Sequence, residues 1–303
     1  MSIVDAHETD DNAALSDEQI AFYDANGYLV LRDRVPAPLL RKLRAAGDRW
    51  ITAGAGRDND DPANADFHFK GGPDVRTMFR VDYLHDKGEP VSLELLGAPC
   101  ILGIAAGLAG PNFVPTYESM VFKAEGDGAA IEWHQDAVHP RKHRIFNVDI
   151  YLDDSVAGAG ALRVVPGSHR RKQDICAIEE DGGWAPEGVT EVEMAPGDVL
   201  IHDVMLVHGS PPVSGNALRR TIYYEFRAAE QILSEGPWDR DWVDRRLRLL
   251  PLALEAHARA FPEAPQFSWQ IDPSLRPPAP DGDDLRVLHV VGTAGSYCSA
   301  GSV

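Results

Sequence analysis

Trp133-His134-Gln135-Asp136 ends a β-forming run near the middle of the chain, and a later run ends at Val207-His208-Gly209-Ser210. Successive side chains of a β-strand point to opposite faces, so His134 and Asp136 would share one face. With one more histidine they would form a 2-His-1-carboxylate set, which binds non-haem Fe(II) and leaves the opposite side of the metal open. This stretch therefore predicts a metal centre built on β-structure.

Short β-forming runs, separated by turn residues, surround this stretch on both sides. They cover residues 116–123, 130–134, 146–152, 161–165, 190–194, 198–202, 205–208 and 220–226. Because no long helix lies between them, this spacing favours a double-sheet jelly roll over a parallel α/β sheet. In such a fold His208, which precedes Gly-Ser-Pro-Pro, would project at the mouth of the barrel.

Helical patterns precede the β-forming region. Ser16 and Gln19 have the form of a capping box, and Gly27 predicts the end of the first helix. A short strand at 28–31 and a second helix, opened by Pro36, are expected to follow.

The chain between these helices and the β-forming region is mixed in character. Residues 53–72 are rich in glycine, aspartate and asparagine, which predicts a mobile loop, with an active-site lid as the alternative. Residues 79–83 predict a strand. Residues 91–109 predict a buried helical segment broken by Pro99 and Gly103.

The region after residue 227 is again helical in pattern. Pro251 should bend or restart its helix, and Arg245-Arg246 predicts a solvated or salt-bridged helix face. We expect residues 1–14 to be disordered, residues 15–263 to form one domain, and residues 264–303 to be an irregular tail. Within the domain, the β core is expected at about 113–227 and C-terminal helices at 238–263.

Charge and composition limit the partners. The chain has 29 lysine and arginine residues against 47 aspartate and glutamate residues, a net charge of −18. This balance argues against nucleic acid or an anionic membrane as partner, but not against an anionic small substrate, because a pocket can be locally basic. The absence of a signal-peptide pattern and of a membrane-length apolar run predicts a cytoplasmic protein. The sequence does not indicate an oligomeric state.

The three cysteines do not indicate a disulfide framework. Cys100, Cys176 and Cys298 are widely separated and odd in number. We therefore expect buried or incidental thiols, with no disulfide and no cysteine metal site.

Several ordered motifs together resemble the phytanoyl-CoA dioxygenase (PhyH) family of Fe(II)/2-oxoglutarate-dependent oxygenases. They are LSDEQIAFYDANGYLVL, WHQD, IYLDD…GALRVVPGSHR, PGDVLIHD and HGS…RR, and they span roughly residues 15 to 227. The resemblance implies a double-stranded β-helix, a cupin-like jelly roll that is mainly β with flanking N-terminal and C-terminal helices. It also implies an enzyme that uses Fe(II), 2-oxoglutarate and dioxygen to hydroxylate a small organic molecule, with release of succinate and carbon dioxide.

The resemblance also implies site residues. His134, Asp136 and His208 match the iron ligands. Arg219, rather than the adjacent Arg220, matches the arginine that grips the distal carboxylate of 2-oxoglutarate.

Further positions match less closely. Ser210 matches a serine that holds the same carboxylate. Lys123 lies where the family usually has Lys-Pro-Pro-Gly, so it would reach the cosubstrate or the substrate. Asn147 and Asp149 share one face of the next strand and would point into the barrel, where Asn147 is expected to be a further cofactor-binding residue. His202 is expected to have a structural role.

Other functions remain open at this point. One is a cupin-like metalloenzyme or isomerase that does not use 2-oxoglutarate, and another is a non-catalytic barrel that binds a small molecule. The stretch 140–144, with His139 and His143, is expected to be a solvated loop; the alternative is that these cations meet an anionic substrate at the cavity mouth. The substrate, and the choice among hydroxylation, desaturation, epimerisation and cyclisation, cannot be inferred from these residues.

Overall fold

The computed structural model describes residues 14–57, 61, 64–70, 77–124, 130–138, 142–214, 218–277 and 297–298. The predicted disordered N-terminus, apart from residue 14, lies outside these residues. So do most of the predicted tail after residue 277 and parts of the predicted loops at 53–72 and 137–145. The domain boundaries expected from the sequence stay predictions.

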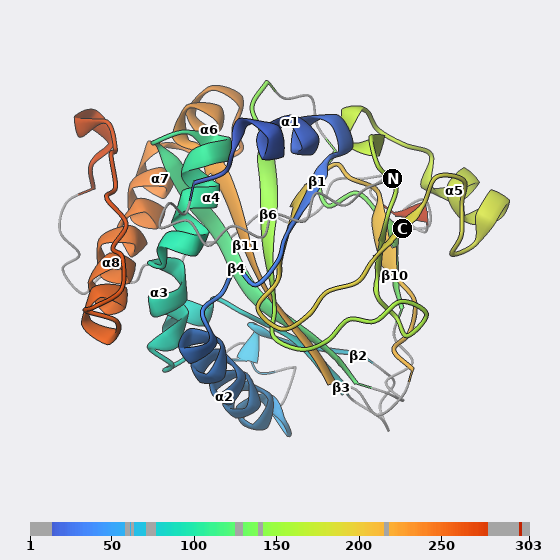
Figure 1. Cartoon of the computed structure of the whole chain (residues 1–303), viewed down its shortest axis with the longest axis horizontal. Coiled ribbons are helices and arrows are strands. Elements are labelled where there is room, and N and C mark those ends of the chain that lie inside the picture. Colours follow the sequence, from blue (N-terminus) through green and yellow to red (C-terminus); the bar gives the residue numbers. More distant parts are fainter. Residues whose placement is uncertain are drawn as a thin grey trace.

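Two antiparallel sheets form the centre of the molecule (Figure 1). The larger sheet has the strand order β1-β9-β6-β11-β4-β3-β2, and the smaller has the order β5-β10-β7-β8. Their bounds are β1 Tyr28–Leu31, β2 Phe67–Lys70, β3 Thr77–Asp82, β4 Phe113–Ala124, β5 Ile131–His134, β6 Ile145–Tyr151, β7 Leu162–Val164, β8 Thr190–Val192, β9 Val199–Asp203, β10 His208–Ser210 and β11 Leu218–Ala228. The sheets face each other, since Lys123 of β4 donates to Ser210 of β10 across the space between them. The predicted jelly roll is confirmed.

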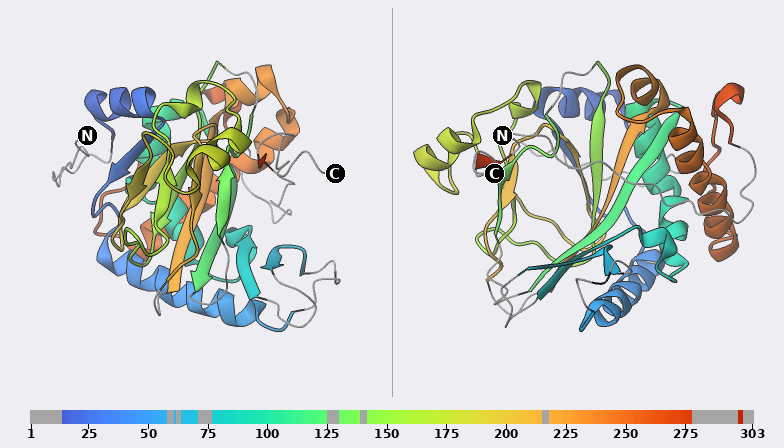
Figure 2. Two further views of the ribbon diagram at one scale, coloured as in Figure 1. Left: turned by 90° about the vertical axis from the view of Figure 1, so that its right-hand side faces the viewer. Right: turned by 180° about the vertical axis from the view of Figure 1, so that it is seen from behind.

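Helices cover the outer face of the larger sheet, as the view from behind also shows (Figure 2). The bounds of the helices are α1 Asp17–Asn26, α2 Ala37–Gly54, α3 Val91–Leu96, α4 Pro99–Ala109, α5 Ile175–Gly182, α6 Ala229–Glu235, α7 Arg240–Leu247 and α8 Leu249–Ala260. Helix α5 lies apart, against the smaller sheet. The largest apolar cluster lies between the other helices and the larger sheet and includes Leu43, Ile101, Phe226 and Leu250. Among the described residues, no helix is both long and apolar enough to cross a membrane.

The start of the chain positions one strand of the site. Ser16 and Gln19 form the predicted capping box, and Gly27 ends α1 with a φ of 80°. A Cβ on Gly27 would lie 2.4 Å from the ring of His169, so the turn also needs glycine for space. The chain then enters β1, where Tyr28 pairs with His202 of β9.

Of the helix predictions, the break at Gly103 is wrong, whereas those at Pro99 and Pro251 are confirmed. Pro99 separates α3 from α4 as expected, but Gly103 lies inside α4 and does not break it. The helix around Pro251 restarts at Leu249, which places the proline in the first turn of α8, where a missing N–H costs little. Helices α5 and α6 were not expected from the sequence.

The prediction of three free thiols is wrong for two of them. Cys176 of α5 and Cys298 form a disulfide across a sequence separation of 122 residues. Cysteine spacing cannot reveal this pair, because it depends on the C-terminal segment returning to α5. Cys100 is a free thiol, and burial raises its pKa to about 11.

A buried ion pair fastens α7 to the sheet; of the two alternatives expected for Arg245-Arg246, a solvated or a salt-bridged face, Arg246 takes the salt-bridged one, but inside the protein. Its guanidinium is fully buried, pairs with Glu118 of β4 and donates to the carbonyl of Pro115 at 2.7 Å. His85 contacts the same carboxylate. Burial alone would raise the pKa of Glu118, but Arg246 and His85 outweigh it and lower the pKa to about 2.

We predict that Arg246→Met lowers the free energy of unfolding by about 3–5 kcal/mol near neutral pH, because it leaves the Glu118 carboxylate buried without its main partner. The pKa of Glu118 is lowered on folding, so the stabilisation is complete above the unfolded-chain pKa of about 4.3 and is lost as pH falls from there toward 2. Urea unfolding at a series of pH values measures both effects. The matched control is Arg245→Met at the exposed neighbouring position, expected within about 0.5 kcal/mol of wild type. Equal losses in the two variants would contradict the prediction.

Candidate metal centre

Three side chains converge where the smaller sheet meets the larger one. Strands β5 and β10 are antiparallel, and His134 lies directly opposite His208 in their register. Asp136 follows two residues after His134, and its Oδ1 lies 3.2 Å from Nε2 of His134 and 3.8 Å from Nε2 of His208. One atom from each of the three side chains lies within 4.8 Å of the others. The predicted set is therefore brought together.

Backbone carbonyls fix the tautomer of both imidazoles. His134 Nδ1 donates to the carbonyl of Glu132 at 2.8 Å, and His208 Nδ1 donates to the carbonyl of Leu206 at 2.9 Å. In the neutral form of each ring, the lone pair would therefore be on Nε2, the nitrogen that faces Asp136. Burial, with the neighbouring His134, lowers the pKa of His208 to about 3, which keeps this imidazole neutral and able to bind a metal.

The second oxygen of Asp136 is held from the larger sheet. Asn147 of β6 donates to its Oδ2 at 2.9 Å, and His202 of β9 lies 3.1 Å from the same atom. The other nitrogen of His202 lies 2.9 Å from Asp149. Oδ1 is thus left facing the two imidazoles, in the orientation that a metal ligand requires.

His202 sits between two carboxylates. Burial alone would lower its pKa, but Asp149 and Asp136 outweigh it and raise the pKa to about 10. Burial would likewise raise the pKa of Asp136, but the three histidines around it hold that pKa well below its usual range. Two imidazoles and one ionised carboxylate make a donor set that suits Fe(II). This set fits the metal that the sequence predicts.

A second cluster of predicted residues lies further along β10 from the triad. Arg219 of β11 pairs in register with Lys123 of β4. Lys123 Nζ donates to Ser210 Oγ at 2.8 Å, and an Arg219 nitrogen donates to the same oxygen at 3.3 Å. Arg219 also donates to the carbonyl of Gly160. All three predicted anion-binding side chains therefore meet, two residues along β10 from His208.

The two adjacent arginines have different surroundings. Arg220 is engaged on the helix side of the sheet, where it donates to Asp153 at 2.8 Å and pairs with Asp48. Arg219 is 7% exposed, and no described carboxylate lies within ion-pair distance of it. Burying a guanidinium without a counter-charge is costly, so this position suits an anionic ligand.

Asn147 does not lie with that cluster. The sequence grouped it with the cosubstrate residues, whereas its amide contacts Asp136 and His202. Its position is that of a residue that orients a metal ligand.

Two residues near the triad were missed or left open by the sequence. Tyr297 stacks on His134, with ring centroids 4.7 Å apart and an interplanar angle of 4°, and is followed by the disulfide-bonded Cys298. No motif in the tail indicates this contact. Gln135, for which the sequence indicates no role, is fully buried, and its amide donates to the carbonyl of Met205 at 2.5 Å.

Comparisons with known proteins agree with this geometry. A family model described as Phytanoyl-CoA dioxygenase (PhyH) matches residues 23–221. The chain is 25% identical over 288 residues to Phytanoyl-CoA dioxygenase 1 of Oryza sativa subsp. japonica, covering 79% of this chain and 97% of that protein. It is 26% identical over 228 residues to a probable alpha-ketoglutarate-dependent hypophosphite dioxygenase of Stutzerimonas stutzeri, covering 70% of this chain and 79% of that protein.

Solved structures share the fold. EvdMO1 superposes with a TM-score of 0.61 and 28% identity over 70% of this chain, which spans 50% of the length of EvdMO1. AviO1 from Streptomyces viridochromogenes Tue57 superposes with a TM-score of 0.59 and 28% identity, covering 71% of this chain and 95% of AviO1. The family match covers most of the jelly roll and both sequence segments that carry the triad. The chain belongs to the phytanoyl-CoA dioxygenase (PhyH) family.

Proposed function

We propose that this protein is a non-haem Fe(II)- and 2-oxoglutarate-dependent dioxygenase that hydroxylates, or otherwise oxidises, a small organic molecule. The observation that carries the proposal is the convergence of two imidazole Nε2 atoms on one carboxylate oxygen, with each side chain already oriented by a hydrogen bond. Family membership and the names of the relatives support the same chemistry.

Each cluster has a role in this proposal. His134, Asp136 and His208 would hold the iron, and Arg219, Ser210 and Lys123 would bind the distal carboxylate of 2-oxoglutarate. When bound, iron and 2-oxoglutarate supply the oxidising power, as dioxygen is reduced and the keto acid is decarboxylated to succinate.

The chain's own residues orient the side chains that would bind the metal. The carbonyls of Glu132 and Leu206 keep each imidazole lone pair directed at the metal position, and Asn147 and His202 keep one oxygen of Asp136 free for it. The facing sheets bury the histidines to about 5% exposure, which limits water at the reacting centre.

The alternatives explain less of the site. The buried guanidinium of Arg219 and the ammonium group of Lys123 both contact the Ser210 hydroxyl. A metalloenzyme without 2-oxoglutarate, or a non-catalytic barrel, does not account for this anion-binding group. Formation of succinate by the iron-loaded protein separates the first proposal from both.

We keep the cytoplasm as the proposed location, with one structural consequence. Reducing conditions there would hold Cys176 and Cys298 as thiols, because disulfides persist mainly in oxidising compartments.

We predict that His208→Ala abolishes tight Fe(II) binding, because only two of the three ligands remain, and that Asn147→Ala weakens it by roughly 10- to 100-fold, because Asp136 loses a hydrogen bond that orients it. Anaerobic calorimetry with Fe(II) measures both. His143→Gln, at an exposed histidine, is the control and should bind iron as wild type does. Unchanged iron affinity in the His208 variant would rule out the proposed centre.

We predict that Arg219→Lys raises the Kd for 2-oxoglutarate by about tenfold or more while Fe(II) affinity is kept, because lysine cannot make the two parallel hydrogen bonds of a guanidinium. Titration of the iron-loaded protein with 2-oxoglutarate, together with a succinate assay, measures the effect. Equal 2-oxoglutarate affinity in the variant and the wild type would remove Arg219 from this role.

A further inference from the structure

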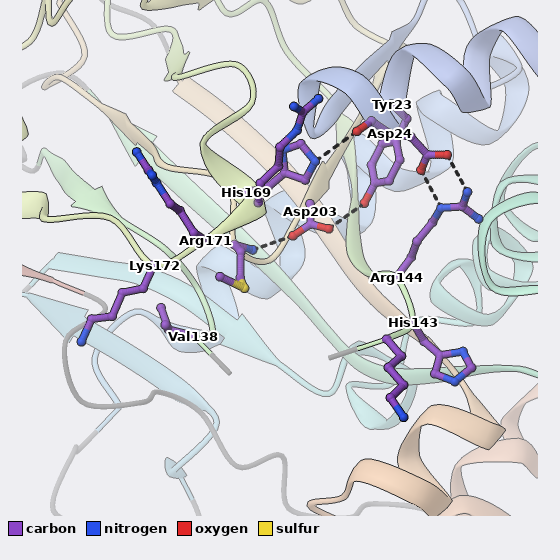
Figure 3. A pocket seen from close by; sticks show the side chains of 12 residues that line it. Tyr23, Asp24, Val138, His143, Arg144, His169, Arg171, Lys172 and Asp203 are labelled. Atoms are coloured by element: carbon purple, nitrogen blue, oxygen red, sulfur yellow. Dashed lines mark hydrogen bonds and ion pairs between the residues drawn. The ribbon is translucent and has the colours of Figure 1, made fainter. Parts of the chain in front are cut away.

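A cavity of about 560 Å³ is lined in part by Val138, two residues along the chain from Asp136 (Figure 3). Its walls come from the end of α1, from the described residues on either side of 139–141, and from the turn at 168–172. This volume is within the usual range for small-molecule sites. Figure 3 shows Arg171 and Lys172 projecting from one wall and His143 and Arg144 standing on the other.

The lining is strongly basic. Five lysine and arginine residues and two histidines line the cavity: Lys142, His143, Arg144, His169, Arg170, Arg171 and Lys172. The chain as a whole carries a net charge of −18, so this concentration of cations runs against the overall balance.

The acidic groups of the lining are already engaged. Asp24 is held by Arg144 through two hydrogen bonds of 2.8 and 2.7 Å. Asp203 accepts the backbone N–H of Met205 at 2.8 Å and lies 3.5 Å from the hydroxyl of Tyr23.

Three cations remain available. Lys142, Arg171 and Lys172 are exposed, and none is within ion-pair distance of a described carboxylate. Glu235 accepts the backbone N–H of Lys142 at 3.0 Å. Three unpaired positive charges around one cavity suit a ligand group with at least two negative charges better than a single carboxylate.

The cavity is tied to the metal centre by the residue between two of its ligands. The Gln135 amide donates to the carbonyls of Met205 and Arg171, both of which line the cavity. Val138, two residues after Asp136, lines it as well. A molecule seated here would therefore lie next to the loop that carries Asp136.

We propose that this cavity binds a multiply charged oxyanion, a phosphate monoester or a dicarboxylate, carried by the molecule that the enzyme oxidises. The substrate part of this inference rests on the proposed function. The cavity would hold the anionic end, and the rest of the molecule would extend toward the triad.

The test uses the full chain, loaded with Mn(II) in place of iron and saturated with 2-oxoglutarate. Three aromatic probes carry a phosphate ester, two carboxylates or no charge: phenyl phosphate, phthalate and benzyl alcohol. Calorimetry should show one phenyl phosphate bound per chain, more weakly as salt is added, and no binding of benzyl alcohol. Binding of phthalate as tight as that of phenyl phosphate would assign the site to dicarboxylates; weaker binding would assign it to phosphate esters.

The matched variants separate this site from general surface charge. K142Q/R171Q/K172Q should weaken phenyl phosphate binding by about tenfold or more, whereas R41Q/R245Q/R259Q, at exposed positions elsewhere, should leave it unchanged. Equal affinity in the two triple variants, or no binding of either anion to the wild type, would overturn the inference.

Two further readouts distinguish this inference from the proposed function. Mn(II) at the triad should broaden the ³¹P resonance of bound phenyl phosphate, and the broadening should vanish in His208→Ala although phenyl phosphate still binds. Bound probe without broadening in the wild type would overturn its role as a substrate subsite. Failure of 2-oxoglutarate to bind or to yield succinate with iron would instead defeat the proposed function.

Discussion

The site depends on one register, the antiparallel pairing of β5 with β10 that sets His134 opposite His208. Strand β10 has only three residues, and β7 holds it on its other side through His208 and Val164. The Ser168 hydroxyl accepts the N–H of Val207 at 2.8 Å and so fixes the approach to the strand. A slip of one residue would turn the imidazole of His208 to the opposite face, so the turn at Ser168 matters to the metal centre without touching it.

The larger sheet supplies what the smaller sheet lacks. The two histidines of the triad, His134 and His208, come from the smaller sheet. The second oxygen of Asp136 is oriented by Asn147 and His202, which pair in register on β6 and β9 of the larger sheet. Strand β9 is in turn paired with β1, whose start is set by Gly27. The orientation of the Asp136 carboxylate therefore depends on β9, on β1 and on the end of α1. Gly27, in the turn between α1 and β1, contributes because it leaves room for His169.

Local patterns predicted much of this arrangement, and long-range returns of the chain could not be predicted. Strand parity places His134 with Asp136, and the capping box marks α1. The choice of Arg219 over Arg220 came from the family resemblance, and the structure gives the two side chains different surroundings. The strand expected at 205–208 instead begins at His208, because a turn occupies the residues before it. The disulfide, the stacking of Tyr297 on His134 and the Arg246–Glu118 pair join residues more than a hundred positions apart. The sequence around each residue does not indicate which distant residue it contacts.

The disulfide beside the triad makes the choice of assay reductant part of the experiment. Ferrous enzymes are commonly kept reduced either with ascorbate, which leaves disulfides intact, or with dithiols, which open them by exchange. The bond links Cys176 to Cys298, next to the ring that covers one face of His134. Two laboratories that differ only in this additive would therefore assay the protein with the covalent link next to its last aromatic side chain closed in one case and open in the other.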